Sequence, residues 1–170
     1  SYVSILANDY TDALALQSVK MVFEYLKRAY DNGNDFEARE KMHNASTMAG
    51  MAFGNAFLGI SHSMAHKVGG RYHIPHGRIN AILLPHVIRY NGIKPAKLST
   101  WPKYQFYQAD KKYYELAKAI GLNPNSYEEG VEMFAKACFE LGQSLGIEMS
   151  FKTQHTDEAD FLANSLELAY

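Results

Sequence analysis

Histidines are concentrated in one short part of this 170-residue chain. Five of the seven lie within residues 62–86, and they are His62, His66, His73, His76 and His86. The first two are four residues apart, so on a continuous helix they share one face. Neutral imidazole is a good ligand for iron, zinc or nickel. The residue type and spacing therefore indicate a transition-metal site.

A glycine pair and a proline favour the approach of a third histidine. The glycines at 69–70 predict the end of the helix that carries the first two histidines. His76 follows Pro75, at the start of the next expected helix. A helix end, a tight turn and a helix start can bring His76 near His62.

Histidines alone leave such a metal short of ligands. Stable four-coordinate sites use three or four protein groups, and no Asp, Glu or Cys lies between Glu40 and Trp101. Ser63 follows His62, so the H-E-x-x-H helix of metal-dependent hydrolases is absent. The missing ligands must come from elsewhere in the fold or from residues absent from this chain.

Composition argues against several other functions. A net charge of −1 gives no electrostatic reason to expect nucleic acid or an acidic membrane surface as a partner. No run of 18 apolar residues is present, so we expect no membrane-spanning segment. The single Cys138 rules out an internal disulfide and fits a reducing cytoplasm. Its helical surroundings favour a buried small side chain over a reactive thiol.

The elements expected to position the histidines are helices. Apolar residues recur at helical spacing from Thr11 to Tyr30. A second, long helix should begin after Asn34 as its cap, with Glu37 as the capping-box partner. From 45 to 60 it carries no charge on any face, which predicts a place in the middle of the domain.

Further helical patterns follow along the chain. The third spans 76–90 and contains Pro85, which should kink or interrupt it. Residues 92–109 are loop-like. The remaining expected helices are about 110–120, ending at Gly121; one from the cap Ser126 to the stop Gly146; and a last one capped by Thr156 that carries Phe161, Leu162 and Leu166.

These patterns predict an all-α, compact multi-helix domain. No glycine-rich loop follows a strand, and a nucleotide-binding half would need one or an equivalent. A length of 170 residues predicts one domain, residues 1–170, that is large enough to bury a core.

The histidine segment also carries a family resemblance. The stretch AGMAFGNAFLGISHSMAHKVGGRYHIPHGRINAILLPHVIRYNG resembles the signature of iron-containing (group III) alcohol dehydrogenases. Within that group it is most similar to the alcohol dehydrogenase half of bifunctional aldehyde-alcohol dehydrogenases. The opening SYVSILANDYTDALALQ and the closing EADFLANSLELAY resemble the same group, so the resemblance covers nearly the whole chain.

The resemblance implies a division into two domains. An N-terminal α/β domain binds NAD, and residues 1–170 would be the C-terminal helical, metal-binding domain of the dehydroquinate synthase-like fold, truncated at both ends. One metal, usually Fe(II) with zinc possible, lies in the cleft between them. Its ligands are an Asp, a His four residues later and two further histidines, which match His62 and His76. The Asp and first His would belong to a segment that runs directly into Ser1.

Further roles follow from the same resemblance. His66 matches a histidine that faces the cleft and takes part in proton transfer to the substrate oxygen. Phe53 matches an aromatic side chain that lines the substrate and nicotinamide pocket. His73 would lie at the rim, and Ile79 replaces a small residue, for which we expect local repacking only. We expect no site role for the structural His86, at a helix kink, or for the surface residues His43 and His155.

The implied reaction is the NAD-linked interconversion of ethanol, or another short primary alcohol, and its aldehyde, with the metal acting as a Lewis acid on the alcohol oxygen. The isolated chain should be inactive. The expected partners are the N-terminal nucleotide-binding domain, the alcohol or aldehyde, and further copies in a homo-oligomer.

Two other function classes remain open. The chain is alternatively a catalytically inert assembly module, since bifunctional relatives form filaments and the aromatic segment at 101–107 suits an interface. A free-standing helical metalloprotein such as a hydrolase is disfavoured, because no carboxylate lies near the histidines to act as ligand or base.

Overall fold

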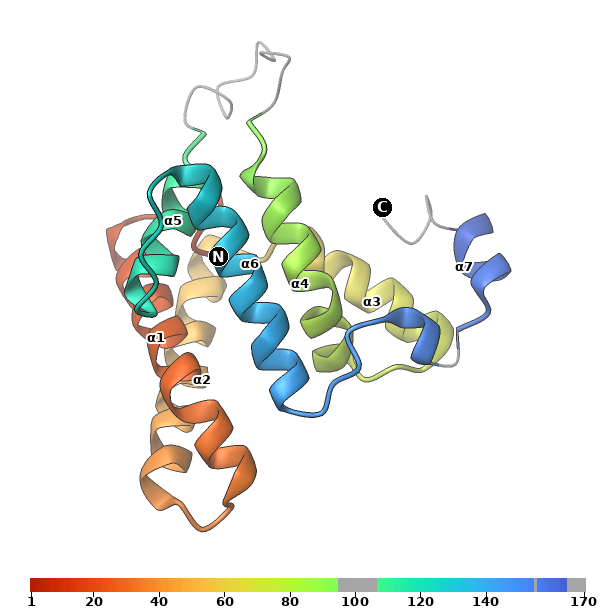
Figure 1. Ribbon diagram of the computed structural model, residues 1–170, viewed down its shortest axis with the longest axis horizontal. Helices are drawn as coiled ribbons and strands as arrows, with labels where there is room; N and C mark the ends of the chain where they lie inside the picture. The colour runs from red at the N-terminus through yellow and green to blue at the C-terminus, as the bar shows by residue number, and fades with distance from the viewer. Residues whose placement is uncertain (95–106, 155, 165–170) are drawn as a thin grey trace.

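Helices make up the regular structure of the domain. The computed structural model describes residues 1–94, 107–154 and 156–164. Within these ranges the secondary structure is helical and contains no strand (Figure 1), which confirms the all-α prediction. The elements are α1 (Asp9–Asp31), α2 (Phe36–Ala56), α3 (Ile60–Tyr72), α4 (His76–Gly92), α5 (Ala109–Ala119), α6 (Tyr127–Ser144), the 3₁₀ turn η2 (Phe151–Thr153) and α7 (Glu158–Ala163).

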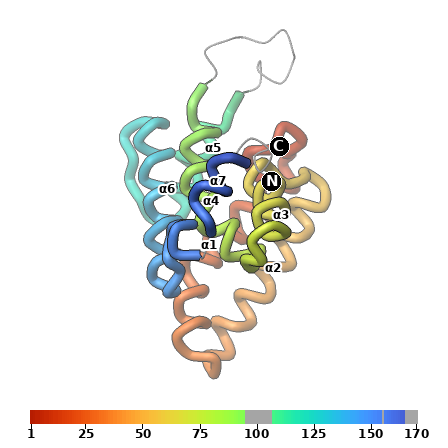
Figure 2. The backbone as a smooth tube through the Cα atoms, turned by 90° about the vertical axis from the view of Figure 1, so that its right-hand side faces the viewer, coloured from red at the N-terminus to blue at the C-terminus, as the bar shows by residue number. Residues whose placement is uncertain are grey.

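Helices α1 and α2 pack side by side as a long hairpin (Figures 1 and 2). The buried Ser18 hydroxyl in α1 donates to the carbonyl of Ala45 in α2 at 2.8 Å. At the turn between them, the Arg28 guanidinium donates to the carboxylates of Asp35 and Glu37. These polar contacts hold the two helices in register, one along the length of the hairpin and the others at its turn.

The cap of α2 lies one residue later than the sequence predicted. The side chain of Asp35, and not that of Asn34, accepts from the Ala38 amide at 3.0 Å. This hydrogen bond, together with Arg28, lowers the pKa of the Asp35 carboxyl. Glu37 is not a capping-box partner, since it accepts from Arg28 instead. A carboxylate at Asp35 suits both the helix N-terminus and the nearby cation.

Caps predicted for the last two helices have different outcomes. The cap of α6 is Ser126, as expected, and its hydroxyl accepts from the Glu129 amide at 3.1 Å. The prediction of Thr156 as the cap of α7 is wrong, because Asp157 accepts from the Asp160 amide at 2.9 Å. Leu166, assigned to this helix from sequence, lies outside the described residues.

The main core lies where α4, α5 and α6 meet, with α1 packed against it. Its buried members are Ile88, Tyr113, Leu116, Ala117, Val131, Phe134 and Ala135. Cys138 packs against this cluster, and burial raises the pKa of its thiol to about 12. A thiol with so high a pKa stays protonated, which agrees with the structural role predicted for it.

A second, smaller core joins α3 to α4. It contains Ala65, Val68, Ile74, Ile79 and Leu83. Gly69 lets the two helices approach closely, because a Cβ there would lie 3.2 Å from Cδ1 of Ile79 and 3.3 Å from the Ile74 carbonyl oxygen. Gly69 therefore serves packing, whereas a Cβ at Gly70 would meet nothing within 4 Å. They do not end the helix, as the sequence suggested; α3 continues to Tyr72 and ends at His73, which has φ 54° and ψ 32°.

Helix α7 lies against the outer side of α3 (Figure 1). Arg71 and Tyr72 both donate to the Asp160 carboxylate, at 2.8 and 2.7 Å. The Arg71 guanidinium, followed by Tyr72, lowers the pKa of Asp160 to about 2. The ring of Tyr72 also stacks on Phe161, with centroids 5.8 Å apart.

The central position predicted for the uncharged half of α2 is wrong. Only Ala45, Ala52 and Ala56 are buried there, while Met51 and Phe53 are exposed. The alanines form one narrow buried stripe, and the larger side chains flank it and remain exposed. Absence of charge therefore marked an exposed apolar face.

Of the two effects expected of Pro85, a kink or an interruption of the third helix, the interruption does not occur. Helix α4 continues through this residue from His76 to Gly92, and Pro85 is fully buried. The stops predicted at Gly121 and Gly146 agree with the structure, since both have positive φ, 90° and 72°, just beyond α5 and α6. Among the described residues, no helix is long and apolar enough to cross a membrane.

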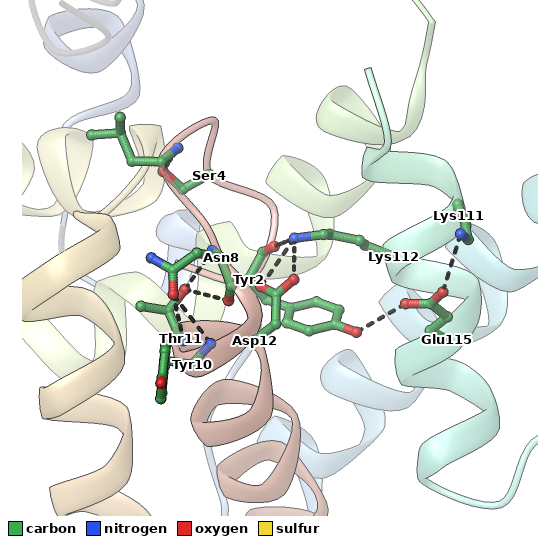
Figure 3. A network of polar contacts seen from close by, with 10 residues as sticks. Tyr2, Ser4, Asn8, Tyr10, Thr11, Asp12, Lys111, Lys112 and Glu115 are labelled. Atoms are coloured by element: carbon green, nitrogen blue, oxygen red, sulfur yellow. Dashed lines mark hydrogen bonds and ion pairs between the residues drawn. The ribbon is translucent and has the colours of Figure 1, made fainter. Parts of the chain in front are cut away.

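The first residues of the chain are fastened to α1 and α5, as Figure 3 shows. The Lys112 ammonium donates to the carbonyl of Tyr2 at 2.7 Å and to the Asp12 carboxylate at 2.7 and 3.0 Å. The Tyr2 hydroxyl donates to Glu115 at 2.9 Å. Because Lys112 is largely buried, this ion pair is screened less by water than a surface pair.

Two glycines test the helix packing. An alanine at Gly130 of α6 would place its Cβ 2.7 Å from Cα of Tyr114 in α5, whereas nothing lies within 4 Å at Gly50 of α2. We expect Gly130→Ala to lower the free energy of unfolding by about 1–3 kcal/mol. Gly50→Ala should raise it by about 0.5–1 kcal/mol. Urea unfolding measures both, and equal effects at the two positions would contradict the packing described here.

Candidate metal centre

The histidines lie beside a break between two helices. The sequence suggested an uncharged helix over residues 45–60, but α2 ends at Ala56 and a separate helix, α3, begins at Ile60 and carries both His62 and His66. At the break, Phe57 has φ 60° and ψ 174°, a conformation that costs a residue other than glycine on the order of 1–3 kcal/mol. The strained turn restarts the helix in a new direction before His62.

Three imidazole rings gather at this point. His62 and His66 lie one turn apart on α3, and His76 is the first residue of α4. The ring centroids of His62 and His76 are 5.3 Å apart, and those of His66 and His76 are 4.8 Å apart. The structure thus brings together the three histidines that the sequence selected.

The spacing of two rings fits a shared metal ion. Two imidazoles bound to one ion at about 2.1 Å with a tetrahedral angle hold their ring centres about 5 Å apart. The separation of His62 and His76, 5.3 Å, is close to this value. Within the described parts of the chain, however, no group of three His, Cys, Asp or Glu side chains is arranged to hold a metal ion. The donor set is compatible with two ligands and incomplete without others.

The other histidines lie apart from this cluster. His73 ends α3 and is exposed, in agreement with a position at the rim. His43 on α2 is exposed, as expected. His86 on α4 is exposed too and directly follows Pro85 within the helix. His155 lies outside the described residues.

The environment of His62 favours the neutral form of its imidazole. Burial lowers the pKa of this imidazole, and the charges of His76, the Ser1 amino group and His66 lower it further. Burial, followed by the charge of Lys112, also lowers the pKa of the Ser1 amino group. Neutral imidazole is the form that binds a metal.

An open hollow of about 470 Å³ lies next to the rings. Its lining consists of Phe53, Gly54, Phe57, Leu58, Gly59, His62, Ser63 and His66. Phe53 and Phe57 are 42% and 64% exposed. Tyr72 does not line the hollow; it is half-buried against Phe161 of α7. We call the exposed side chains of Phe53 and Phe57 the apolar wall of the hollow. An apolar wall beside imidazoles suits a small, partly apolar molecule with one polar group.

Sequence reasoning missed two residues that contact the cluster. Ser61 donates to Oδ1 of Asn80 at 2.9 Å, and Nδ2 of Asn80 lies 3.2 Å from Nε2 of His76. Asn80 follows His76 by four residues, so helical spacing alone would have placed the two on one face. Nothing in the sequence signals Ser61, because its contact crosses between helices.

Known proteins are similar to this chain in sequence and in fold. The sequence profile "Fe-containing alcohol dehydrogenase family, C-terminal" matches residues 1–167. The chain is 60% identical over all its 170 residues to an aldehyde-alcohol dehydrogenase of Streptococcus pneumoniae serotype 2. It spans only 19% of the length of that relative.

Two solved structures extend the comparison. An alcohol dehydrogenase from Oenococcus oeni is 36% identical, with a TM-score of 0.85 over 99% of this chain and 40% of its own. A sulfoacetaldehyde reductase from Bifidobacterium kashiwanohense, solved in complex with NAD+, is 26% identical, with a TM-score of 0.76 over 99% of this chain and 39% of its own.

The exposed apolar wall should make the isolated chain self-associate, because large apolar patches on soluble proteins mark contact surfaces. We expect sedimentation at micromolar concentration to show oligomers, and Phe53→Ser to return the chain to a monomer. Phe36→Ser is the matched control, since Phe36 is 81% exposed at the other end of α2. A chain that is already monomeric, or that loses association equally with both variants, would show that the exposed face at Phe53 and Phe57 does not mediate self-association.

Proposed function

This chain belongs to the Fe-containing alcohol dehydrogenase family, and on that premise we propose that it is the helical metal-binding domain of an NAD-linked enzyme. The enzyme would interconvert a short primary alcohol, ethanol first among them, and its aldehyde. Residues 1–170 would supply half of the metal ligands and one wall of the substrate pocket. An N-terminal nucleotide-binding domain would supply the rest, in a cytoplasmic protein.

The gathering of three imidazoles at one end of the hollow carries this proposal. His62 and His76 approach each other at the spacing that two ligands of one ion need. Lowered pKa and partial burial make His62 a ready donor. Fe(II), or zinc in its place, when bound supplies a Lewis acid that lowers the pKa of the alcohol. The remaining ligands would be an Asp and a His from residues that precede Ser1.

The remaining residues of the hollow orient the substrate and move its proton. His66 is exposed, with its ring 4.8 Å from that of His76, so it can accept the hydroxyl proton of an alcohol held beside the two ligands. Phe53, Phe57 and Leu58 would pack on the short alkyl chain and exclude water. Hydride transfer belongs to NAD, which the partner domain would bind opposite this wall.

An assembly role remains a second candidate. The exposed Phe53 and Phe57 favour it, since the same wall serves equally as an interface between copies in a homo-oligomer. The aromatic segment at 101–107, the other support for this idea, lies outside the described residues except for Tyr107. The hydroxyl of Tyr107 donates to the Asn91 carbonyl at 2.9 Å, so this tyrosine packs on its own domain.

Metal binding tests the ligand assignment. In the full-length protein, His62→Ala and His76→Ala should each lower metal affinity by more than the roughly 10–100-fold that outer-shell changes cost. His86→Ala is the matched control, because this exposed histidine lies on the same helix as His76 but away from the rings. Metal content by mass spectrometry checks this, and unchanged content in both ligand variants would remove the proposed function.

Activity of the isolated chain gives an independent test. With NAD and ethanol we expect no significant alcohol oxidation, because half of the ligands and the dinucleotide site are absent from residues 1–170. NADH absorbance at 340 nm, a property of the cofactor, follows the reaction. Turnover by the isolated chain that His62→Ala abolishes would show that this domain carries a complete site.

A further inference from the structure

We propose that Ser61 and Asn80 are positioning residues that hold the His76 ring at its distance from His62. The inference rests on the proposed function, because it takes His76 as a metal ligand. Neither residue touches the hollow, and both act only through the imidazole of His76. We call the pair the Ser61–Asn80 strap.

Two hydrogen bonds fix the orientation of the Asn80 amide. Its Oδ1 accepts from the Ser61 hydroxyl at 2.9 Å, and its Nδ2 donates to the main-chain carbonyl of His76 at 3.1 Å. Reversing the amide would set its oxygen against the carbonyl oxygen of His76, so the observed orientation is the one that both contacts require. Since Ser61 is buried at the start of α3, the strap ties the first turn of α3 to the first turn of α4.

The amide nitrogen lies over the face of the imidazole. Nδ2 of Asn80 is 3.2 Å from Nε2 and 3.4 Å from Nδ1 of His76. An approach in the ring plane at these nearly equal distances would drive the amide into the ring carbon between the two nitrogens. The contact is therefore an amide packed on the ring face. It leaves the lone pair of either nitrogen free for another partner, which a metal ligand needs.

His76 has little other support. It is the first residue of α4, the preceding Pro75 provides no side-chain cap, and the histidine is exposed. An exposed side chain samples several rotamers, and ordering it on metal binding opposes the binding. The strap selects one ring position before any ligand arrives. It also couples that position to α3, which carries His62.

The test measures metal affinity and stability together. In the full-length, metal-free protein, Co²⁺ is titrated as the probe and its binding is followed by calorimetry, with the thermal midpoint measured in parallel. We expect Asn80→Ala and Ser61→Ala each to weaken Co²⁺ binding about tenfold, as outer-shell changes do. The double variant should weaken it little more than Asn80→Ala does, because both single changes break one strap.

Ser18→Ala is the matched control. It also removes a buried serine hydroxyl that bonds across two helices, but between α1 and α2 and away from the rings. We expect it to lower the thermal midpoint while leaving Co²⁺ affinity unchanged. If Asn80→Ala fails to fold, Ser61→Ala decides alone.

Two results would overturn the strap. One is Co²⁺ affinity that changes less than twofold in Ser61→Ala, and the other is an equal loss of affinity in Ser18→Ala. The ligand variants His62→Ala and His76→Ala, measured in the same titration, separate this failure from that of the proposed function. If they abolish binding while the strap variants do not, only the strap is wrong.

Discussion

The close packing of α3 on α4 is the constraint on which the candidate site depends. Gly69 has no side chain at the point where Ile79 crosses it, so the two helices approach as closely as backbone and side chain allow. Ile79 is fully buried there, one turn beyond His76. A wider separation would carry His76 away from His62, since one ring belongs to each helix. The second core is thus small, but it sets the geometry of the rings.

The long helix α2 shows how one element serves both stability and a site. Its buried stripe consists of alanines that pack on α1, where the Ser18 hydroxyl adds a polar tie at Ala45. Its other face presents Phe53 to the hollow. Small residues on the packed side of α2 let the two helices of the hairpin approach closely. No space remains between them for the large apolar side chains, which are therefore exposed. This distribution is unfavourable for an isolated domain and suits one that meets a partner.

The backbone turn that precedes the histidines is strained. Phe57 adopts a backbone conformation that favours glycine, and the turn it forms redirects the chain into α3. Lys112 fastens the first residues of the chain, at Tyr2, to α1 and α5. A strained residue such as Phe57 persists only where the surrounding structure holds it, so the packing of the domain offsets the cost of the turn.

The sequence by itself determined the helical fold, the grouping of the histidines and the family, because these depend on local periodicity, on spacing and on a long signature. It also located Ser126 as a cap and Gly121 and Gly146 as stops, which are local effects of hydrogen bonding and backbone conformation. Only the tertiary structure decided the break at Phe57, the exposure of α2, the packing role of Gly69 and the contact of Ser61 with Asn80. Each of these depends on which helix lies opposite. The sequence of an apolar stripe is the same whether or not a neighbouring element covers it.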